Sequence, residues 1–437
     1  MTFLSEPAPQ FHTLSNGMRV VFFPQPYLHS VGIGFYVRVG SRFENIQNMG
    51  ISHFLEHVLF RGNERYPSSL EMNRAFESWG GSINGYTTRE YTYFFGQLHP
   101  DHLNDAIPFM GDFVSKPLFE GVELERKIIL EERLEDVDED GQDLEVDDVS
   151  RIGIWGNDPL AHKIIGSPRT LRYIQEKHLR EHFEQFYHVD NVVLCVTGAF
   201  EPEDILPLIE EAFAHFPKKE KPQNGDKEDK ILFSLPKKPL TSTAFVTHDS
   251  SQVSLQLSFL GVAPDDPAFF STLLFERILD DGMSSRLWQR IVEEKGLCYE
   301  IWASLDVYHD VSLLDIGASV APERVVPLVE SIYEELRQLR DDGPTEEEFV
   351  LARRRWSFRQ EYVLDQVENL NERLGVGLLF NLYLPLQEQV KQMNAVTLDS
   401  FLNVSQSVLR ADRSHLAAVG PMRKSSKRKL KELLLAF

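Results

Sequence analysis

Two stretches of this chain, "DNVVLCVTG" at 190–198 and "DRSHLAAVG" at 412–420, follow one pattern. Each begins with an aspartate, continues as an apolar run typical of a buried strand, and reaches a glycine eight residues later. A polar turn and an amphipathic helix follow in both places. The pattern therefore predicts that the chain contains two copies of one α+β unit.

Other segments support a tandem duplication. The stretch "HLNDAIPFMGDFV" at 102–114 resembles "ERVVPLVESIYEEL" at 323–336, with a proline at a similar place in each. Residues 216–230 are polar and carry proline and glycine without periodicity, so we expect a linker at 217–235. We expect an N-terminal unit at 1–216 and a homologous unit at 236–437, each a mixed, mainly antiparallel sheet packed with helices.

The composition excludes several classes of function. The chain has 437 residues and a net charge of −22, which argues against nucleic acid as a partner. No apolar run approaches the length of a membrane span, and the first residues show no targeting pattern. Cys195 and Cys298 fit no paired spacing and suit a reducing compartment. We therefore expect a cytoplasmic protein that binds neither membrane nor nucleic acid.

The pattern H-x-x-E-H, known from zinc peptidases, occurs twice, as "HFLEH" at 53–57 and "HLREH" at 178–182. On a helix, histidines four residues apart lie on one face and can bind one ion, and the neighbouring glutamate can act as a general base. The first motif lies among Phe54, Leu55 and Val58, whereas charged residues surround the second. We therefore expect a metal centre at the first motif and surface histidines at the second.

A zinc site of this kind needs a third protein ligand. The predicted helix "ELERKIILEERLE" at 123–135 offers Glu125, Glu131 and Glu132. Glu125 and Glu132 are seven residues apart and share a helix face. One of them could bind the ion while the other orients a ligand histidine.

These motifs together resemble a known family. "HFLEH", "GGSINGYTTREYTYFF" at 80–95, "ERKIILEE" at 125–132 and "GMSSRLWQRIVEEKGLCYEIW" at 282–302 are similar to stretches of the pitrilysin-like inverted-motif zinc metallopeptidases. The length matches the half-sized branch, which includes the β subunit of mitochondrial processing peptidase and bacterial processing proteases. The resemblance implies one zinc ion per chain. It assigns as ligands His53, His57 and Glu132, with Glu56 as the general base and Glu125 supporting a ligand.

The resemblance also implies where a substrate lies. Asn84 and Gly85 match an edge strand to which substrate peptide pairs, although alanine is usual where this chain has Gly85. Tyr299 matches a substrate-binding tyrosine of the second unit. The arginine that normally precedes it by seven residues is replaced by Val292, and Arg290 lies two residues earlier. Either Arg290 substitutes, or another chain supplies the cation, or substrate binding is weaker here.

The expected function is zinc-dependent endopeptidase activity on peptides or unfolded segments. Because the family encloses its substrate between two halves of this size, we expect a homodimer, with a heterodimer as the alternative. Two other functions stay open. The chain could be a zinc-bearing subunit that needs a partner with the missing arginine, or a non-catalytic structural subunit of a peptidase-like assembly.

Overall fold

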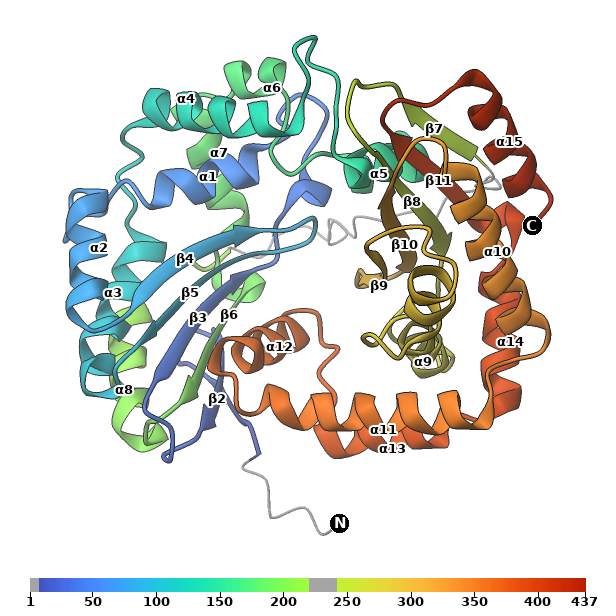
Figure 1. The fold of residues 1–437 in the computed structure, drawn as a ribbon. Helices are drawn as coiled ribbons and strands as arrows, with labels where there is room; N and C mark the ends of the chain where they lie inside the picture. The colour runs from blue at the N-terminus through green and yellow to red at the C-terminus, as the bar shows by residue number, and fades with distance from the viewer. Residues whose placement is uncertain (1–7, 220–241) are drawn as a thin grey trace, which may run out of the picture. The chain divides into compact units, whose positions relative to one another are not determined.

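The computed structural model describes residues 8–219 and 242–437. The chain divides into two compact units, and Figure 1 shows their elements. Within the described residues, the first unit contains 8–133, 162–219 and 361–383, and the second contains 134–161, 242–360 and 384–437. Most of the linker predicted at 217–235 lies outside the described residues.

The first unit is built on a six-stranded sheet with the order β1-β2-β6-β3-β5-β4. β2 and β6 are parallel, and the other neighbours are antiparallel. The central strands β3 and β6 are buried along their whole length because both faces of the sheet are covered. The strands are β1 (Gln10–Thr13), β2 (Arg19–Pro24), β3 (Val31–Val37), β4 (Ser82–Thr87), β5 (Thr92–Leu98) and β6 (Val192–Gly198).

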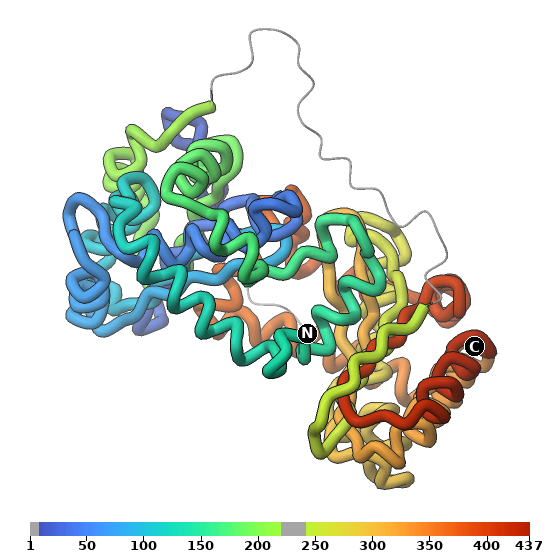
Figure 2. Tube along the Cα trace, turned by 90° about the horizontal axis from the view of Figure 1, so that it is seen from above, coloured from blue at the N-terminus to red at the C-terminus, as the bar shows by residue number. Residues whose placement is uncertain are grey.

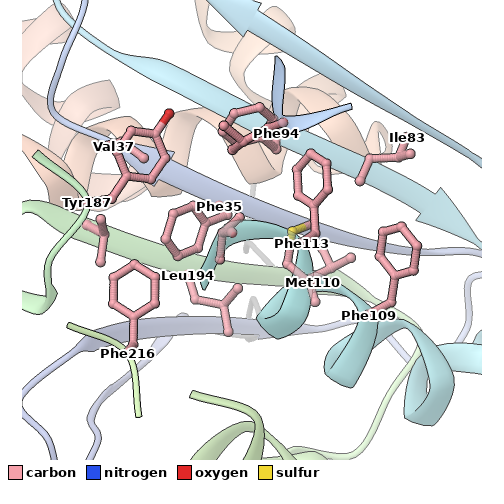
Figure 3. Close-up of a cluster of buried hydrophobic side chains, with 14 of the residues drawn as sticks. Phe35, Val37, Ile83, Phe94, Phe109, Met110, Phe113, Tyr187, Leu194 and Phe216 are labelled. Atoms are coloured by element: carbon pink, nitrogen blue, oxygen red, sulfur yellow. The ribbon is translucent and has the colours of Figure 1, made fainter. Parts of the chain in front are cut away.

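Aromatic side chains dominate the core on one face of this sheet. Figure 3 shows Phe35 and Phe94 from neighbouring strands in one cluster with Phe109 and Phe113 of helix α3. Phe94 and Phe113 meet edge to face with their ring centroids 5.1 Å apart. The helices of this unit are α1 (Ile51–Leu59), α2 (Ser69–Ser78), α3 (Leu103–Ser115), α4 (Val122–Glu132), α6 (Pro168–Tyr173), α7 (Glu176–Phe186), α8 (Pro202–Phe213) and α12 (Val367–Leu379).

The second unit has a five-stranded sheet with the order β7-β11-β8-β10-β9. Its strands are β7 (Ser242–Val246), β8 (Val253–Leu260), β9 (Ile301–Val307), β10 (Ser312–Val320) and β11 (Ser414–Val419). Its helices include α5 (Val146–Trp155), α9 (Phe269–Leu279), α10 (Val325–Asp341), α13 (Leu386–Ala395), α14 (Leu398–Val408) and α15 (Lys424–Leu435). Helix α11 (Glu346–Val363) ends just beyond the boundary between the units.

The two sheets confirm the predicted α+β fold of two similar units. The two stretches with the shared pattern form β6 and β11, which occupy equivalent places. β6 lies between a parallel β2 and an antiparallel β3, and β11 lies between a parallel β7 and an antiparallel β8. Among the described residues, no helix is both long and apolar enough to cross a membrane.

Each sheet is covered on one face by a helix from the other half of the chain. The predicted boundaries at 216 and 236 do not account for this exchange of helices. α12 packs on β3 and β6, where the Asn371 side chain accepts a hydrogen bond from the Tyr36 hydroxyl at 2.8 Å. α5 packs on β11 and β8, where Arg151 forms a buried ion pair with Asp315 at 2.6 Å. Figure 2 shows the segment with α5, in teal and green, beside the yellow and red strands of the second unit.

Candidate metal centre

Helix α1 carries the first motif. It begins after Gly50, whose φ of 90° is left-handed, and an added Cβ there would lie 2.8 Å from Ile165 O. Phe54, Leu55 and Val58 are fully buried and fix the rotation of the helix against the sheet. As a result, His53 and His57 project from the same side, with their ring centroids 4.6 Å apart.

Glu44 fixes the start of this helix. Its carboxylate accepts the backbone N–H groups of Gly50 at 2.7 Å and Ser52 at 2.8 Å. Burial raises the pKa of Glu44 to about 7, against the opposing effect of those hydrogen bonds. Glu44 was not predicted from the sequence, because an irregular segment separates it from the helix and it matches no capping spacing.

Glu132, the last residue of α4, completes a group of three donors. Its two carboxylate oxygens lie 3.6 Å from His53 Nε2 and 3.6 Å from His57 Nε2. Nitrogen and oxygen ligands at ~2.0–2.1 Å around a tetrahedral zinc ion lie roughly 3.3–3.4 Å apart. Both distances are close to that separation, and donor atoms of His53, His57 and Glu132 all lie within 4.8 Å of one another, so the group could hold a zinc ion. Glu131 is exposed and is not part of this group.

Glu125 lies behind His57, as expected for a supporting residue. The Nδ1–H of His57 donates to Glu125 Oε2 at 3.1 Å, which leaves Nε2 free to bind a metal. Arg61 holds the other oxygen of Glu125 at 3.1 Å. Burial lowers the pKa of His57, but the bond to Glu125 and the nearby carboxylates outweigh it and raise the pKa. Burial, aided by His57, lowers the pKa of His53 to about 3, so that ring is neutral.

Glu56 lies between helix α1 and strand β4. Its side chain is buried, and its Oε2 accepts a hydrogen bond of 2.6 Å from the Thr87 hydroxyl. Burial raises the pKa of Glu56, while Thr87 and His57 partly oppose that rise. A raised pKa makes a carboxylate a stronger base than an exposed glutamate. The position and the environment of Glu56 therefore suit a general base.

Strand β4 forms one edge of the first sheet. It pairs with β5, and no described strand lies on its other side. Asn84 is exposed on β4, and Gly85 lies beside Glu56. The free edge of the sheet thus lies on the strand that contacts Glu56 of the first motif.

The second motif has a different environment from the one expected. His182 is only 4% exposed, so its interpretation as a surface histidine is wrong. Its Nε2 is hydrogen-bonded at 3.1 Å to Oγ of Ser52, the residue before His53 in the sequence. Leu179 and Phe183 are also buried, and their helical spacing to His182 was the signal for this burial.

His178 makes local contacts on the same helix. Its Nδ1 accepts the N–H of Gln175 at 3.1 Å, and its ring stacks on Tyr173. The two histidines and Glu181 line a cavity of about 210 Å³. Within the described part of the chain, neither histidine belongs to a group of three metal donors. The second motif therefore supports the helix of the first motif.

We expect His182→Ala to lower the free energy of unfolding by about 1–3 kcal/mol, because it leaves Ser52 without its buried partner. Urea denaturation of the purified variant measures this loss. The matched control is His178→Ala, which removes a half-exposed ring and costs less. Zinc content should stay at the parent level in both variants. A folded His182→Ala protein that has lost its zinc would contradict this supporting role.

The second unit presents Tyr299 to solvent. Its side chain is 87% exposed, which excludes a role in the core. Val292 packs against the hydrophobic core of this unit. Arg290 is exposed and pairs with Glu294 at 2.8 Å, one turn further along the chain. The position of Val292 therefore carries an apolar side chain that packs on the core. The nearby Arg290 forms an ion pair with Glu294.

Comparison with known proteins identifies the family. The model "Insulinase (Peptidase family M16)" matches residues 19–167, and the model "Peptidase M16 inactive domain" matches residues 173–355. The chain belongs to peptidase family M16. The match to the inactive-domain model begins in the first unit, just before α7, and continues through most of the second unit.

Relatives of similar length support the assignment to the half-sized M16 branch. "Uncharacterized zinc protease YmxG" of Bacillus subtilis is 28% identical, covering 94% of this chain and 98% of the relative. The crystal structure of a protease from Helicobacter pylori has a TM-score of 0.86 at 19% identity, covering 95% of this chain and 100% of that one. A structure titled as a peptidase M16 inactive domain from Pseudomonas fluorescens has a TM-score of 0.82 at 20% identity, with coverage of 94% and 98%. The two solved structures share the M16 fold.

Proposed function

We propose that this M16 chain is a zinc-dependent endopeptidase that binds one zinc ion per chain. The observation that carries the proposal is the convergence of His53, His57 and Glu132 beside the buried carboxylate of Glu56. A second M16 chain would complete the chamber, and we propose a cytoplasmic homodimer. The substrate would be a peptide or an unfolded segment, since only an extended chain can pair with a strand edge.

The residues of the site divide the reaction between them. A zinc ion bound there would supply Lewis acidity, which makes water nucleophilic near neutral pH and polarises the scissile carbonyl. Glu56 takes the proton from the attacking water and returns it to the leaving amine. Glu125 keeps His57 in the tautomer that has a free Nε2. The backbone of β4, including Asn84 and Gly85, pairs with the substrate backbone.

Metal analysis and peptide cleavage by the purified chain alone test this function. We expect about one zinc per chain, a dimer by size-exclusion chromatography, and cleavage of a mixed peptide pool that stops when a chelator removes the metal. A chain that binds zinc as a dimer but cleaves no peptide would contradict the proposal.

A second candidate function is a zinc-bearing subunit that needs a different partner to hold substrate. Val292 favours it, because this position packs in the core where the family usually places a substrate-binding arginine. Cleavage that appears only after a partner chain is added would support this candidate against the homodimer. A structural subunit without activity would show neither zinc-dependent cleavage alone nor activation by a partner.

Val292→Arg should lower the KM for peptides by about 10-fold, because one charge-assisted hydrogen bond contributes about 1.5–3 kcal/mol. The half-buried position lets a long side chain reach solvent. Steady-state kinetics on one fluorogenic peptide measure the change. Arg290→Ala is the control, and its KM should stay near the parent value. An unchanged KM in Val292→Arg together with a raised KM in Arg290→Ala would assign the substrate contact to Arg290.

A further inference from the structure

Strand β4 has a second relation to the site besides its free edge. Ile83, Gly85 and Thr87 alternate along the strand and lie on the face toward α1, whereas Asn84 and Tyr86 are exposed on the other face. The Thr87 hydroxyl donates to Glu56 Oε2 at 2.6 Å. One face of the edge strand is therefore in contact with the carboxylate of Glu56.

Gly85 allows this close approach. A Cβ at this position would lie 2.8 Å from Glu56 Cγ and 2.8 Å from the Phe60 ring. It would also lie 2.9 Å from Glu56 Oε1. Glycine thus leaves the space into which the glutamate side chain packs, while Thr87, two residues further on, binds its oxygen. A side chain at position 85 would require Glu56 to move away from the strand.

We propose that Thr87 is a positioning residue that holds the carboxylate of Glu56 against β4, in the space left by Gly85. This inference rests on the proposed peptidase function. It has a specific consequence for the reaction. The substrate pairs with the edge of β4 and the general base is hydrogen-bonded to a side chain of β4, so one strand fixes both the peptide and the base. The distance between them then does not depend on the packing between two separate elements.

The alternative is that Thr87 only satisfies a buried carboxylate and contributes to stability. If Thr87 positions the base, its removal lowers kcat in protein that is still folded, whereas the loss of a purely structural contact changes only the stability. Thr87→Val removes the hydroxyl and keeps the shape of the side chain, and Thr87→Ser keeps the hydroxyl. This matched pair separates the two roles.

We expect Thr87→Val to lower kcat by about 10- to 100-fold, with KM and zinc content close to the parent. Thr87→Ser should restore most of kcat. Gly85→Ala should also lower kcat, because the added methyl moves Glu56 although Thr87 is still present. An unchanged kcat in Thr87→Val, or a loss that follows its thermal stability and is not rescued by serine, would overturn the role of Thr87. An unchanged kcat in Gly85→Ala would overturn the part assigned to Gly85.

A binding measurement tests the same inference without turnover. Acetohydroxamate binds zinc and also hydrogen-bonds to a neighbouring carboxylate, whereas a simple thiol such as mercaptoethanol binds the metal alone. Thr87→Val should weaken acetohydroxamate by several-fold and leave mercaptoethanol unchanged. If the parent chain binds zinc and cleaves no peptide, the proposed function fails, while this comparison still tests Thr87. Equal effects on both compounds would overturn the positioning role.

Discussion

Glu56→Gln is expected to abolish nearly all peptide cleavage and to leave the protein folded with its zinc in place. Glutamine keeps the length of the side chain and can still accept the hydrogen bond from Thr87, but it cannot take a proton. Removing a general base typically costs about 10²- to 10⁴-fold, and this residue also returns the proton to the leaving amine. Cleavage assays and metal analysis of the same preparation measure both properties.

The second motif supplies the matched control. Glu181→Gln changes the glutamate at the same place in "HLREH", on a helix whose glutamate is exposed. Turnover and zinc content of Glu181→Gln should equal those of the parent. If Glu56→Gln still cleaves peptides at the parent rate, Glu56 is not the base, and the assignment of the first motif is wrong.

Glu132→Gln is expected to release most of the zinc. A neutral amide is a poor substitute for a carboxylate, and only two histidine ligands would remain from the protein. We expect a loss of zinc affinity larger than about 100-fold, which is the upper end for residues that only support a ligand. Competition against a chromogenic chelator gives the affinity, and His57→Ala should behave similarly.

Two other glutamates of helix α4, Glu125 and Glu131, serve as comparisons for Glu132. Glu125→Gln should cost about 10- to 100-fold in zinc affinity, because it weakens the bond that orients His57 without removing a ligand. Glu131→Gln should bind zinc as the parent does, since its exposed side chain lies outside the donor group. A larger loss from Glu131→Gln than from Glu132→Gln would show that the third ligand is misassigned.

The parts of the site that were predictable from the sequence depend on short spacings. His53 and His57 are one helical turn apart, so the helix alone brings them together. The repeat of one strand pattern at 190 and 412 likewise predicted two similar sheets. Each copy of the pattern is a short apolar run, and such a run forms a buried strand from its local sequence alone. The family resemblance then selected Glu132 over Glu131, a choice that spacing alone left open.

The parts that were missed depend on contacts between distant segments. Glu44 reaches α1 from an irregular segment, and no periodic pattern marks such a residue. His182 lies within a highly charged helix, where the composition suggested solvent exposure although its two apolar neighbours face the core. Similarly, the amphipathic patterns of α5 and α12 predict helices but do not specify which sheet each helix covers.

The exchange of α5 and α12 makes the two halves of the sequence depend on each other. α12 belongs to the second half of the chain, yet it covers Tyr36, Phe95 and Val193 on the sheet of the first unit. Deleting the second half of the chain would remove α12 and expose that apolar face of the first sheet to solvent. Because α12 packs on the first sheet and α5 on the second, neither half of the sequence can bury both faces of its own sheet alone.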